Sequence, residues 1–296
     1  MSSASFDDAL VPGLRRLTDS LHAHGALVFA QIFHGGLRAD PALTGERTWS
    51  ANEVDGGPRA ATEEDLRRVI AQFADAAGRA HAAGMDGVEI HGAHGYLLTQ
   101  FLSVTENTRS DAWGGSLENR ARLIRGVTRA VRSRVPAGFV VGVRISPEDF
   151  GNAKGIDLDE SLTVGKWLAE DGIDFLHLSL WDVSKRSTKR PDAHVVPQFR
   201  ASVPEDVRLF VAGKIWTRSD AEQMLALGAD FVALGRSAIA NPDWAHRVVE
   251  PAWEPKRPPL TGKELLERAL SPGFVDYMRR WKGFVMEESS AEITQP

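Results

Sequence analysis

Cysteine is absent from this chain of 296 residues. Without thiolates of its own, the chain can form no disulfide, no cysteine nucleophile and no iron–sulfur cluster, although a metal site built from histidines and carboxylates stays open. An excess of positive charge is missing as well, because 35 lysine and arginine residues stand against 40 acidic residues and give a formal net charge of −5. That balance provides no general attraction for DNA, RNA or an anionic membrane.

Long apolar runs are missing too. No unbroken apolar stretch approaches the roughly 18 residues that indicate a membrane-spanning helix. The first residues, MSSASFDDALVPG, lack the basic region and apolar run of a secretory signal peptide. We therefore expect a cytoplasmic protein without a membrane or nucleic-acid partner. A composition with 43% hydrophobic and 25% charged residues predicts a folded chain with a sizeable core.

What the chain does contain is a recurring unit: an amphipathic helix, a glycine that ends it, and a short run of apolar and β-branched residues. In the second unit, Thr62 and Asp65 are spaced as a capping box at the start of a helix that Gly84 ends. Helices are predicted over residues 8–24, 62–83, 116–135, 157–171 and 219–227. Strands are predicted in ALVFAQI, GVEIHG, FVVGVRIS, IDFLHLSL, RLFVAGKI and DFVALGRS. Apolar strands that alternate with helices predict an α/β protein with a parallel sheet covered on both faces.

Two α/β architectures fit this alternation, a doubly wound sheet and a TIM (β/α)8-type barrel. The polar residues favour the barrel. One of them stands at or just after the C-terminal end of each predicted strand: Gln31, His91, Arg144, His177, Lys214 and Arg236. In a barrel these ends converge on one mouth, whereas in an open sheet only those near a switch point meet. We predict an incomplete barrel, because six strands are recognisable where a barrel has eight.

One domain with a tail is the division that we predict. The barrel domain covers residues 1–250, and the tail covers residues 251–296. An amphipathic piece within the tail, residues 274–284, is expected to cap the barrel or to contact a second subunit in a homo-oligomer. Long connections follow the first, second and fourth strands, at residues 35–61, 95–115 and 181–206. Connections of this length favour roles in binding a substrate or cofactor.

Two histidines and a tyrosine follow the strand GVEI, in the sequence His91-Gly92-Ala93-His94-Gly95-Tyr96. Imidazoles three residues apart at a strand end can donate two hydrogen bonds to a single oxygen, which polarises a carbonyl or nitro group. Tyr96 adds a phenolic proton donor beside them. The same spacing also suits a metal site, or two histidines that only bond to neighbouring loops. The residues alone leave these three interpretations open.

Arg144 and Gln31 end two further strands. A cation among the apolar residues of VVGVRIS is costly unless it meets an anion or an electron-rich ligand. Pairing with Glu89 on a neighbouring strand is the alternative explanation for Arg144. Gln31 can offer a donor and an acceptor to the edge of a small-molecule ligand, or it can be a satisfied interior amide.

The last two predicted strands end in Gly213-Lys214 and Gly235-Arg236. Barrels frequently bind phosphate at this position through glycine N–H groups, with a basic side chain that adds charge. Each pair alone could be a strand-end glycine beside a solvated cation. On consecutive units, however, the two pairs favour a phosphate. Together with a polarised oxygen elsewhere in the mouth, they indicate a cofactor-dependent enzyme.

A longer ordered set of motifs resembles a known family. The set consists of HGAHGYLLTQFLSVTENTRSDAWGGSLENRARL, Gln31 in QIFHGGLRAD, Arg144 in VGVRIS, and Gly235-Arg236 in ALGRSAIANPDW, and it spans nearly the whole chain. It is similar to the Old Yellow Enzyme family of FMN-dependent ene-reductases (NADH:flavin oxidoreductases). The resemblance implies a TIM-barrel flavoprotein with one FMN in its mouth. It also implies an oxidoreductase that passes hydride from NADH or NADPH through the flavin to an activated alkene, such as an enone.

The resemblance further implies roles for individual residues. The catalytic residues would be His91 and His94, which bind the substrate's oxygen, and Tyr96, which protonates the α-carbon. Arg144 would stabilise negative charge on the reduced flavin ring. The full set of cofactor-binding residues would be Gln31 and Arg144 at the flavin, with Gly213, Lys214, Gly235 and Arg236 at its phosphate.

One departure from the family concerns the start of the chain. Members of the family begin with two strands that this sequence lacks, so we interpret Met1 as an internal start and the chain as a fragment of a complete enzyme. A non-catalytic remnant, or a protein completed by a partner chain, is the alternative. A metal-dependent hydrolase is a third interpretation and requires several imidazoles to converge on a metal: His34, His91, His94 and His177.

Overall fold

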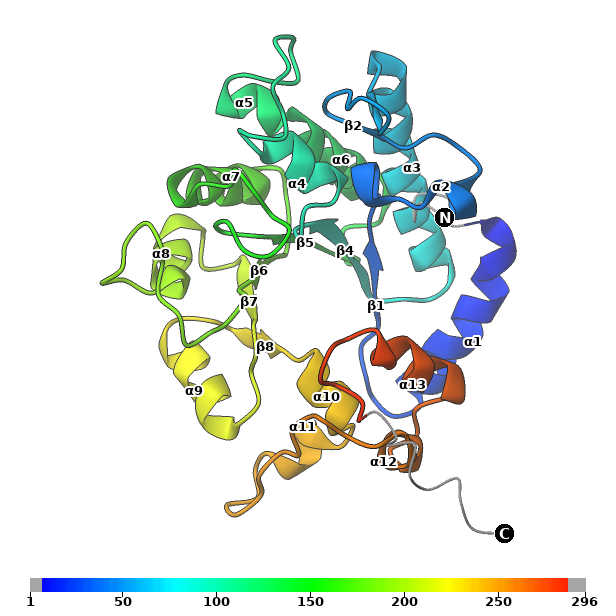
Figure 1. Cartoon of the computed structure of the whole chain (residues 1–296), viewed down its shortest axis with the longest axis vertical. Helices are drawn as coiled ribbons and strands as arrows, with labels where there is room; N and C mark the ends of the chain where they lie inside the picture. The colour runs from blue at the N-terminus through cyan, green and yellow to red at the C-terminus, as the bar shows by residue number, and fades with distance from the viewer. Residues whose placement is uncertain (1–6, 287–296) are drawn as a thin grey trace.

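The centre of the molecule is a curved sheet of six parallel strands. The computed structural model describes residues 7–286. In spatial order, which is also chain order, the strands are β1 (Phe29–Ile32), β4 (Gly87–Gly92), β5 (Val140–Ile145), β6 (Phe175–Ser179), β7 (Arg208–Ala212) and β8 (Phe231–Ala233). Figure 1 shows these strands along an open arc with the long helices outside it. This arrangement confirms the predicted α/β class and the incomplete TIM-type barrel.

The predicted helices cover the outer face of the sheet. The observed elements are α1 (Val11–His22), α3 (Glu63–Ala82), α6 (Arg122–Arg134), α7 (Leu158–Glu170) and α9 (Arg218–Ala226). The capping box at the start of α3 is present, since Thr62 and Asp65 each accept a hydrogen bond from the other's backbone N–H. Leu66, Val69 and Phe73 form the buried face of α3, as their helical spacing predicts.

The structure differs from the predicted elements at three places. Residues 8–10 form a short 3-10 helix, η2 (Asp8–Leu10), before α1 begins. The helix predicted over 116–135 is two helices, α5 (Leu117–Arg120) and α6, with the break at Ala121. The loop predicted over 181–206 contains α8 (Val195–Ser202), whose Val195, Val196 and Phe199 are buried. The proline inside this short segment hides its helical periodicity from a sequence reading.

Two other long connections also carry local structure. Residues 35–61 contain η3 (Gly36–Arg38), α2 (Pro41–Thr44) and a pair of short parallel strands, β2 (Trp49–Ser50) and β3 (Arg59–Ala60). Residues 95–115 contain α4 (Leu97–Leu102). Within residues 7–286, no helix is long and apolar enough to cross a lipid bilayer.

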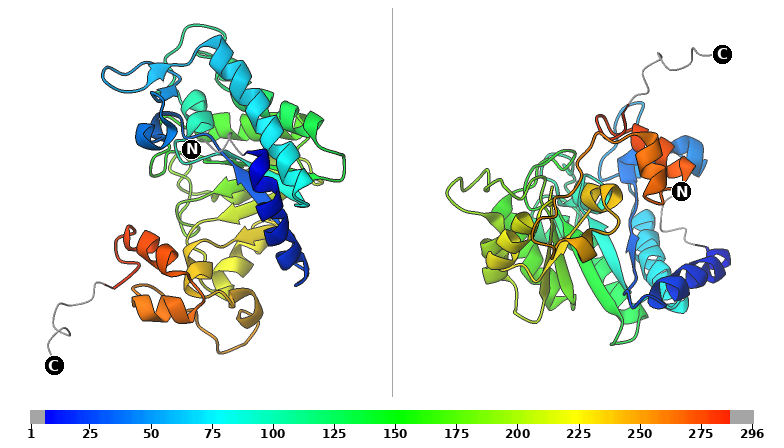
Figure 2. Two further views of the ribbon diagram at one scale, coloured as in Figure 1. Left: turned by 90° about the vertical axis from the view of Figure 1, so that its right-hand side faces the viewer. Right: turned by 90° about the horizontal axis from the view of Figure 1, so that it is seen from below.

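The C-terminal segment builds a small apolar cluster of its own. It contains α10 (Arg236–Ala240), α11 (Trp244–Arg247), α12 (Gly262–Glu267) and α13 (Pro272–Arg279). Side chains of α12, α13 and the following turn pack with Trp216 and Ala240, so the tail is anchored where β7 and β8 end. Figure 2 shows the tail helices as a group beside α10. The outer ends of the two predicted domain ranges, residues 1–6 and 287–296, lie outside the described residues.

A row of phenylalanine rings lines the inner face of the sheet near the N-terminal ends of its strands. The rings of Phe29 and Phe175 stack at 5.9 Å between centroids, those of Phe175 and Phe210 at 4.5 Å, and Phe231 continues the row at 4.6 Å. Gly142 stands directly opposite Phe175 in the sheet register, and a Cβ atom there would overlap the ring. This row, the aromatic floor, lies away from the C-terminal ends of the strands, where the predicted polar residues stand.

Candidate active site

The sheet register brings the predicted polar residues together at the C-terminal ends of neighbouring strands. Gln31 lies opposite Glu89, His91 lies opposite Arg144, and Arg144 lies opposite His177. Since alternate residues of a strand share a face, Glu89 and His91 of β4 point the same way. The prediction that these residues meet is therefore confirmed for β1, β4, β5 and β6.

His91, His94 and Tyr96 form one aromatic group. The ring centroids of His91 and His94 are 4.8 Å apart, and those of His91 and Tyr96 are 5.4 Å apart. Phe33, just after β1, packs against both His91 and Tyr96. The guanidinium of Arg38 lies 5.2 Å from the centre of the Tyr96 ring and donates to the carbonyl of His94. Two imidazoles and a phenol thus lie in one group, with a cation at its edge.

A strained turn sets the direction of His94. Its φ of 63° is left-handed, which is uncommon for a residue other than glycine, and Gly95 follows with a φ of 71°. The backbone N–H of His94 donates to Oγ of Ser146 at 3.1 Å, which holds the turn against β5. At Gly95, a Cβ atom would overlap the carbonyl oxygen of Asn152. Only glycine fits there without moving the neighbouring loop.

Both imidazoles are neutral at physiological pH. Burial lowers the pKa of His91 to about 3, helped by the positive charge of Arg144 and by the nearby His94. Desolvation, again with the charge of Arg144, lowers the pKa of His94 to about 4. Neutral imidazoles can each donate one N–H without adding charge, and Nδ1 of His91 is buried without a hydrogen-bond partner. The pair is therefore suited to hydrogen-bond an oxygen of a ligand.

Ser179 links the histidines to Arg144. Its Oγ lies 2.6 Å from Nε2 of His94 and accepts a hydrogen bond from Nη2 of Arg144 at 3.0 Å. Sequence reasoning did not select Ser179, although it is two residues beyond His177 on β6 and so shares that residue's face. Nε of Arg144 is buried without a partner. Burial lowers the pKa of Arg144, while Glu89 opposes that shift.

The alternative pairing of Arg144 with Glu89 is not what the structure shows. Oε1 of Glu89 accepts from the amide nitrogen of Gln31 at 2.5 Å, and Oε2 lies 2.5 Å from Nδ1 of His177. Gln31 therefore has one side committed to Glu89 and the rest of its amide exposed. Nε2 of His177 is buried without a hydrogen-bond partner. The guanidinium of Arg144 and the carboxylate of Glu89 act on each other through space.

The two glycine–cation pairs follow β7 and β8, as predicted. Gly213 has a φ of 154°, and a Cβ there would overlap the carbonyl of Leu180. Lys214 donates from Nζ to Asp182 at 3.0 Å, so its charge is shared with a carboxylate. At Gly235 no atom lies within 4 Å of the Cβ position, and Arg236 is exposed beside it. The open space at Gly235 leaves room for a ligand group to approach the backbone.

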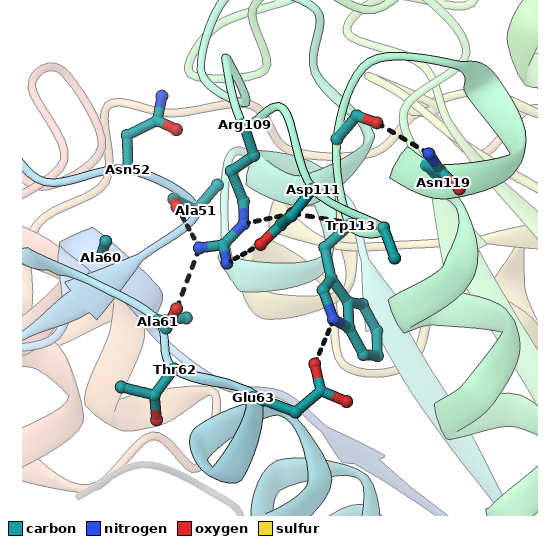
Figure 3. A network of polar contacts seen from close by, with 12 residues as sticks. Ala51, Asn52, Ala60, Ala61, Thr62, Glu63, Arg109, Asp111, Trp113 and Asn119 are labelled. Atoms are coloured by element: carbon teal, nitrogen blue, oxygen red, sulfur yellow. Dashed lines mark hydrogen bonds and ion pairs between the residues drawn. The ribbon is translucent and has the colours of Figure 1, made fainter.

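The long motif after Tyr96 is mostly scaffolding. Figure 3 shows Arg109 at its centre, where Nη1 donates to the carbonyls of Ala51 and Ala61 and the rest of the guanidinium pairs with Asp111. In the same view the indole N–H of Trp113 donates to Glu63 at the start of α3. These contacts fasten the loop after α4 to the loop after β1, which carries Arg38.

The four histidines of the hydrolase interpretation do not form a ligand set. The His34 ring packs at a tilt against Trp49, with 4.6 Å between ring centroids, and its Nδ1 accepts from the backbone N–H of Gly36. His177 is committed to Glu89. Among residues 7–286, no three histidine or acidic side chains gather closely enough to hold a metal ion. The convergence of imidazoles that this interpretation requires is absent from the described part of the chain.

Alignments with similar known proteins cover most of this chain but smaller shares of the relatives' own lengths. A probable NADH-dependent flavin oxidoreductase of Bacillus subtilis is 34% identical over 258 residues, which are 83% of this chain and 69% of that protein. An NADPH dehydrogenase of Bacillus licheniformis is 33% identical over 93% of this chain and 77% of its own length. An NADH:fumarate oxidoreductase of Klebsiella pneumoniae is 36% identical over 82% of this chain, which spans only 28% of that protein.

A solved structure and a family model also match this chain. A solved structure of an old yellow enzyme homologue from Zymomonas mobilis superimposes with a TM-score of 0.76 at 28% identity, over 90% of this chain and 80% of that one. The NADH:flavin oxidoreductase / NADH oxidase family matches residues 1–252. The parallel barrel strands, the histidine pair and the polar strand ends described above lie within that range. This chain belongs to the NADH:flavin oxidoreductase / NADH oxidase family.

Proposed function

We propose that this chain binds FMN, the cofactor of its family, and uses NADH or NADPH to reduce an activated alkene such as an enone. The observation that carries the proposal is the neutral pair His91 and His94, 4.8 Å apart between ring centroids, with Tyr96 beside them. This group can bind a carbonyl oxygen and donate a proton. Arg144 stands opposite His91 on the neighbouring strand β5, and Gln31 stands opposite Glu89 on β1.

The residues present fit FMN. The flavin's pyrimidine edge alternates acceptors with a donor, and the free part of the Gln31 amide and the guanidinium of Arg144 are complementary to such an edge. The unpartnered Nε of Arg144 is a buried donor that such a ligand would satisfy. Gly213 and Gly235, with Lys214 and Arg236, would hold the phosphate, since Gly235 leaves its backbone open to a ligand.

Bound FMN would supply two-electron chemistry, because it can accept electrons from a nicotinamide and pass them to an alkene. His91 and His94 would hold the substrate's carbonyl oxygen and withdraw electron density from the conjugated double bond. Tyr96 would donate a proton from its phenol to the α-carbon. Arg144 would favour negative charge on the neighbouring edge of the cofactor, because its guanidinium stays protonated in proteins.

The test begins with the visible spectrum of the purified chain after FMN has been added and the excess removed. We expect a retained flavin band and NADH- or NADPH-dependent reduction of 2-cyclohexenone under anaerobic conditions. His91→Ala and His94→Ala should weaken enone binding, and Tyr96→Phe should slow turnover by about 10² or more, the usual share of a general acid. His246→Ala, at an exposed histidine, is the matched control. Absence of a flavin band would overturn the proposal, and a flavin band without enone turnover would overturn its substrate class.

The tail would mediate self-association. Phe274, Tyr277 and Trp281 are 40%, 45% and 52% exposed, although aromatic side chains usually bury most of their surface. We propose that the exposed aromatic residues between 274 and 281, within the tail predicted to begin at residue 251, contact a second copy. Sedimentation of the wild type and of Trp281→Ser should then differ in apparent mass.

A further inference from the structure

Glu89 is a buried carboxylate that the proposed reaction does not use. It is 9% exposed and lies on β4, two residues before His91 and on the same face of the strand. Its two oxygens have different partners: Oε1 accepts from Gln31 on β1, and Oε2 meets His177 on β6. Burying a carboxylate costs free energy unless hydrogen bonds and opposite charges compensate, and Gln31, His177 and Arg144 are the groups that can do so here.

The hydrogen bond to Gln31 fixes the direction of that amide. An ionised carboxylate can only accept hydrogen bonds, so the amide nitrogen of Gln31, and not its oxygen, must face Glu89. The carbonyl oxygen of Gln31 and its second N–H are consequently the groups left for a ligand. Glu89 thereby determines which pattern of donor and acceptor the strand end presents.

Glu89 is also the counter-charge to Arg144. Burial alone would raise the pKa of Glu89, but the hydrogen bonds from His177 and Gln31 and the charge of Arg144 together bring its pKa below the usual value. Burial lowers the pKa of His177, so the imidazole is the neutral partner of an ionised carboxylate. The carboxylate makes no ion pair with Arg144 within the described residues, and the two charges interact across the strands.

We propose that Glu89 is a positioning residue that orients Gln31 and partly offsets the positive charge of Arg144. It thereby lowers the reduction potential of bound FMN. The inference rests on the proposed binding of FMN by Gln31 and Arg144. The reduced cofactor carries more negative charge than the oxidised one. A buried negative charge beside Arg144 weakens the attraction of this site for the reduced form, which lowers the midpoint potential.

Glu89→Gln separates the two roles. The substitution removes the charge but keeps a carbonyl oxygen that can accept from Gln31. We expect reduced FMN to bind about tenfold more tightly relative to oxidised FMN than in the wild type, which is about +30 mV for a two-electron couple. Glu89→Leu should shift the potential in the same direction and also weaken FMN binding, because Gln31 loses its acceptor. The readouts are a dye-coupled reductive titration and the dissociation constant of oxidised FMN.

Asp171→Asn is the matched control. Asp171 is a buried carboxylate that pairs with Arg125 and Arg129 at the C-terminal end of α7, at the opposite end of the sheet. We expect its substitution to leave the midpoint potential unchanged. If Glu89→Gln does not fold, as judged by circular dichroism, His177→Phe replaces it. Loss of that donor raises the pKa of Glu89, and partial protonation should shift the potential upward by a smaller amount.

The outcomes separate this inference from the proposed function. A wild-type chain that binds no FMN would overturn both. A wild-type chain that binds FMN, with a Glu89→Gln or His177→Phe potential equal to that of Asp171→Asn, would overturn the role of Glu89 alone. A shift to a more negative potential would also overturn it, since the sign follows from the charge that is removed.

Discussion

Ser179 Oγ lies 2.6 Å from Nε2 of His94, so a hydroxyl on β6 contacts an imidazole in the loop after β4. The same oxygen accepts from Arg144 on β5. Because the hydroxyl has one proton and two lone pairs, it can accept from Arg144 while it donates to His94. The residue that would bind substrate and the residue that would face the cofactor are therefore joined through one side chain.

Ser179→Ala should weaken substrate binding more than FMN binding. The substitution frees His94 to rotate and leaves Nη2 of Arg144 without its acceptor. We expect kcat/KM for 2-cyclohexenone to fall about tenfold, the usual size of one lost hydrogen bond. Ser202→Ala is the control, because the Ser202 hydroxyl donates to the carbonyl of Phe199 within α8, away from the histidines. An unchanged KM in Ser179→Ala would show that His94 is held by its turn alone.

Stability should fall as the pH drops below neutral. Burial lowers the pKa of His34 to about 4 and that of His91 to about 3, whereas an unfolded histidine titrates near 6.5. Between pH 7 and 5 the unfolded chain therefore takes up protons that the folded chain does not bind, and the free energy of unfolding decreases. We expect a loss of about 1–2 kcal/mol for each of these two residues.

Urea denaturation at pH 7, 6 and 5 measures this slope. His34→Gln should flatten it, because the variant removes one of the titrating groups. His246→Gln, at an exposed position, is the control. Equal slopes in all three proteins would mean that His34 is readily protonated in the fold.

Gly95→Ala should destabilise the loop that carries His94. The φ of 71° at this position is strained for alanine, and the new Cβ would overlap the carbonyl of Asn152. We expect a loss of about 1–3 kcal/mol in unfolding free energy. Gly138→Ala is the comparison, since nothing lies within 4 Å of the Cβ position there. Coincident thermal melts of Gly95→Ala and Gly138→Ala would contradict the close approach of Gly95 to the carbonyl of Asn152.

Arg109→Ala tests the scaffolding role of the long motif. The guanidinium satisfies the carbonyl of Ala51, a fully buried residue, and that of Ala61. Without it these acceptors lose their donor, and we expect a loss of about 1–3 kcal/mol. Arg67, on the exposed face of α3, gives the control Arg67→Ala. Limited proteolysis should cut between residues 102 and 117 faster in Arg109→Ala, and an equal rate in both variants would show that the loop is held by other contacts.

The fold was largely predictable because burial leaves a periodic trace in the sequence. The stripe of Leu66, Val69 and Phe73 and the capping box at Thr62 identify α3 from local spacing alone. Helix α8 was not predicted, because it is only eight residues long and Pro197 lies inside it. A short apolar segment of this kind does not distinguish a helix from a loop that packs on the core.

The sequence predicted which residues belong to the candidate site, but not which of them form hydrogen bonds with one another. Strand ends identify Gln31, His91 and Arg144, because a parallel sheet brings those ends together. Which of them Glu89 contacts depends on side-chain reach across strands, and the sequence offered Arg144 where the structure has Gln31 and His177. Ser179 carries no sequence signal beyond its place two residues after His177. Partner choice in a buried network is a property of the folded chain.

The aromatic floor has a consequence for how this sequence can change by descent. Phe175 stands opposite Gly142 in the register, and its ring occupies the space that the missing side chain leaves. Neither residue of this pair can be exchanged alone without overlap or a void. A lineage that enlarges Gly142 must therefore shrink Phe175 at nearly the same step, whereas at Gly87 the backbone of Val140 blocks a side chain whatever stands at Phe29.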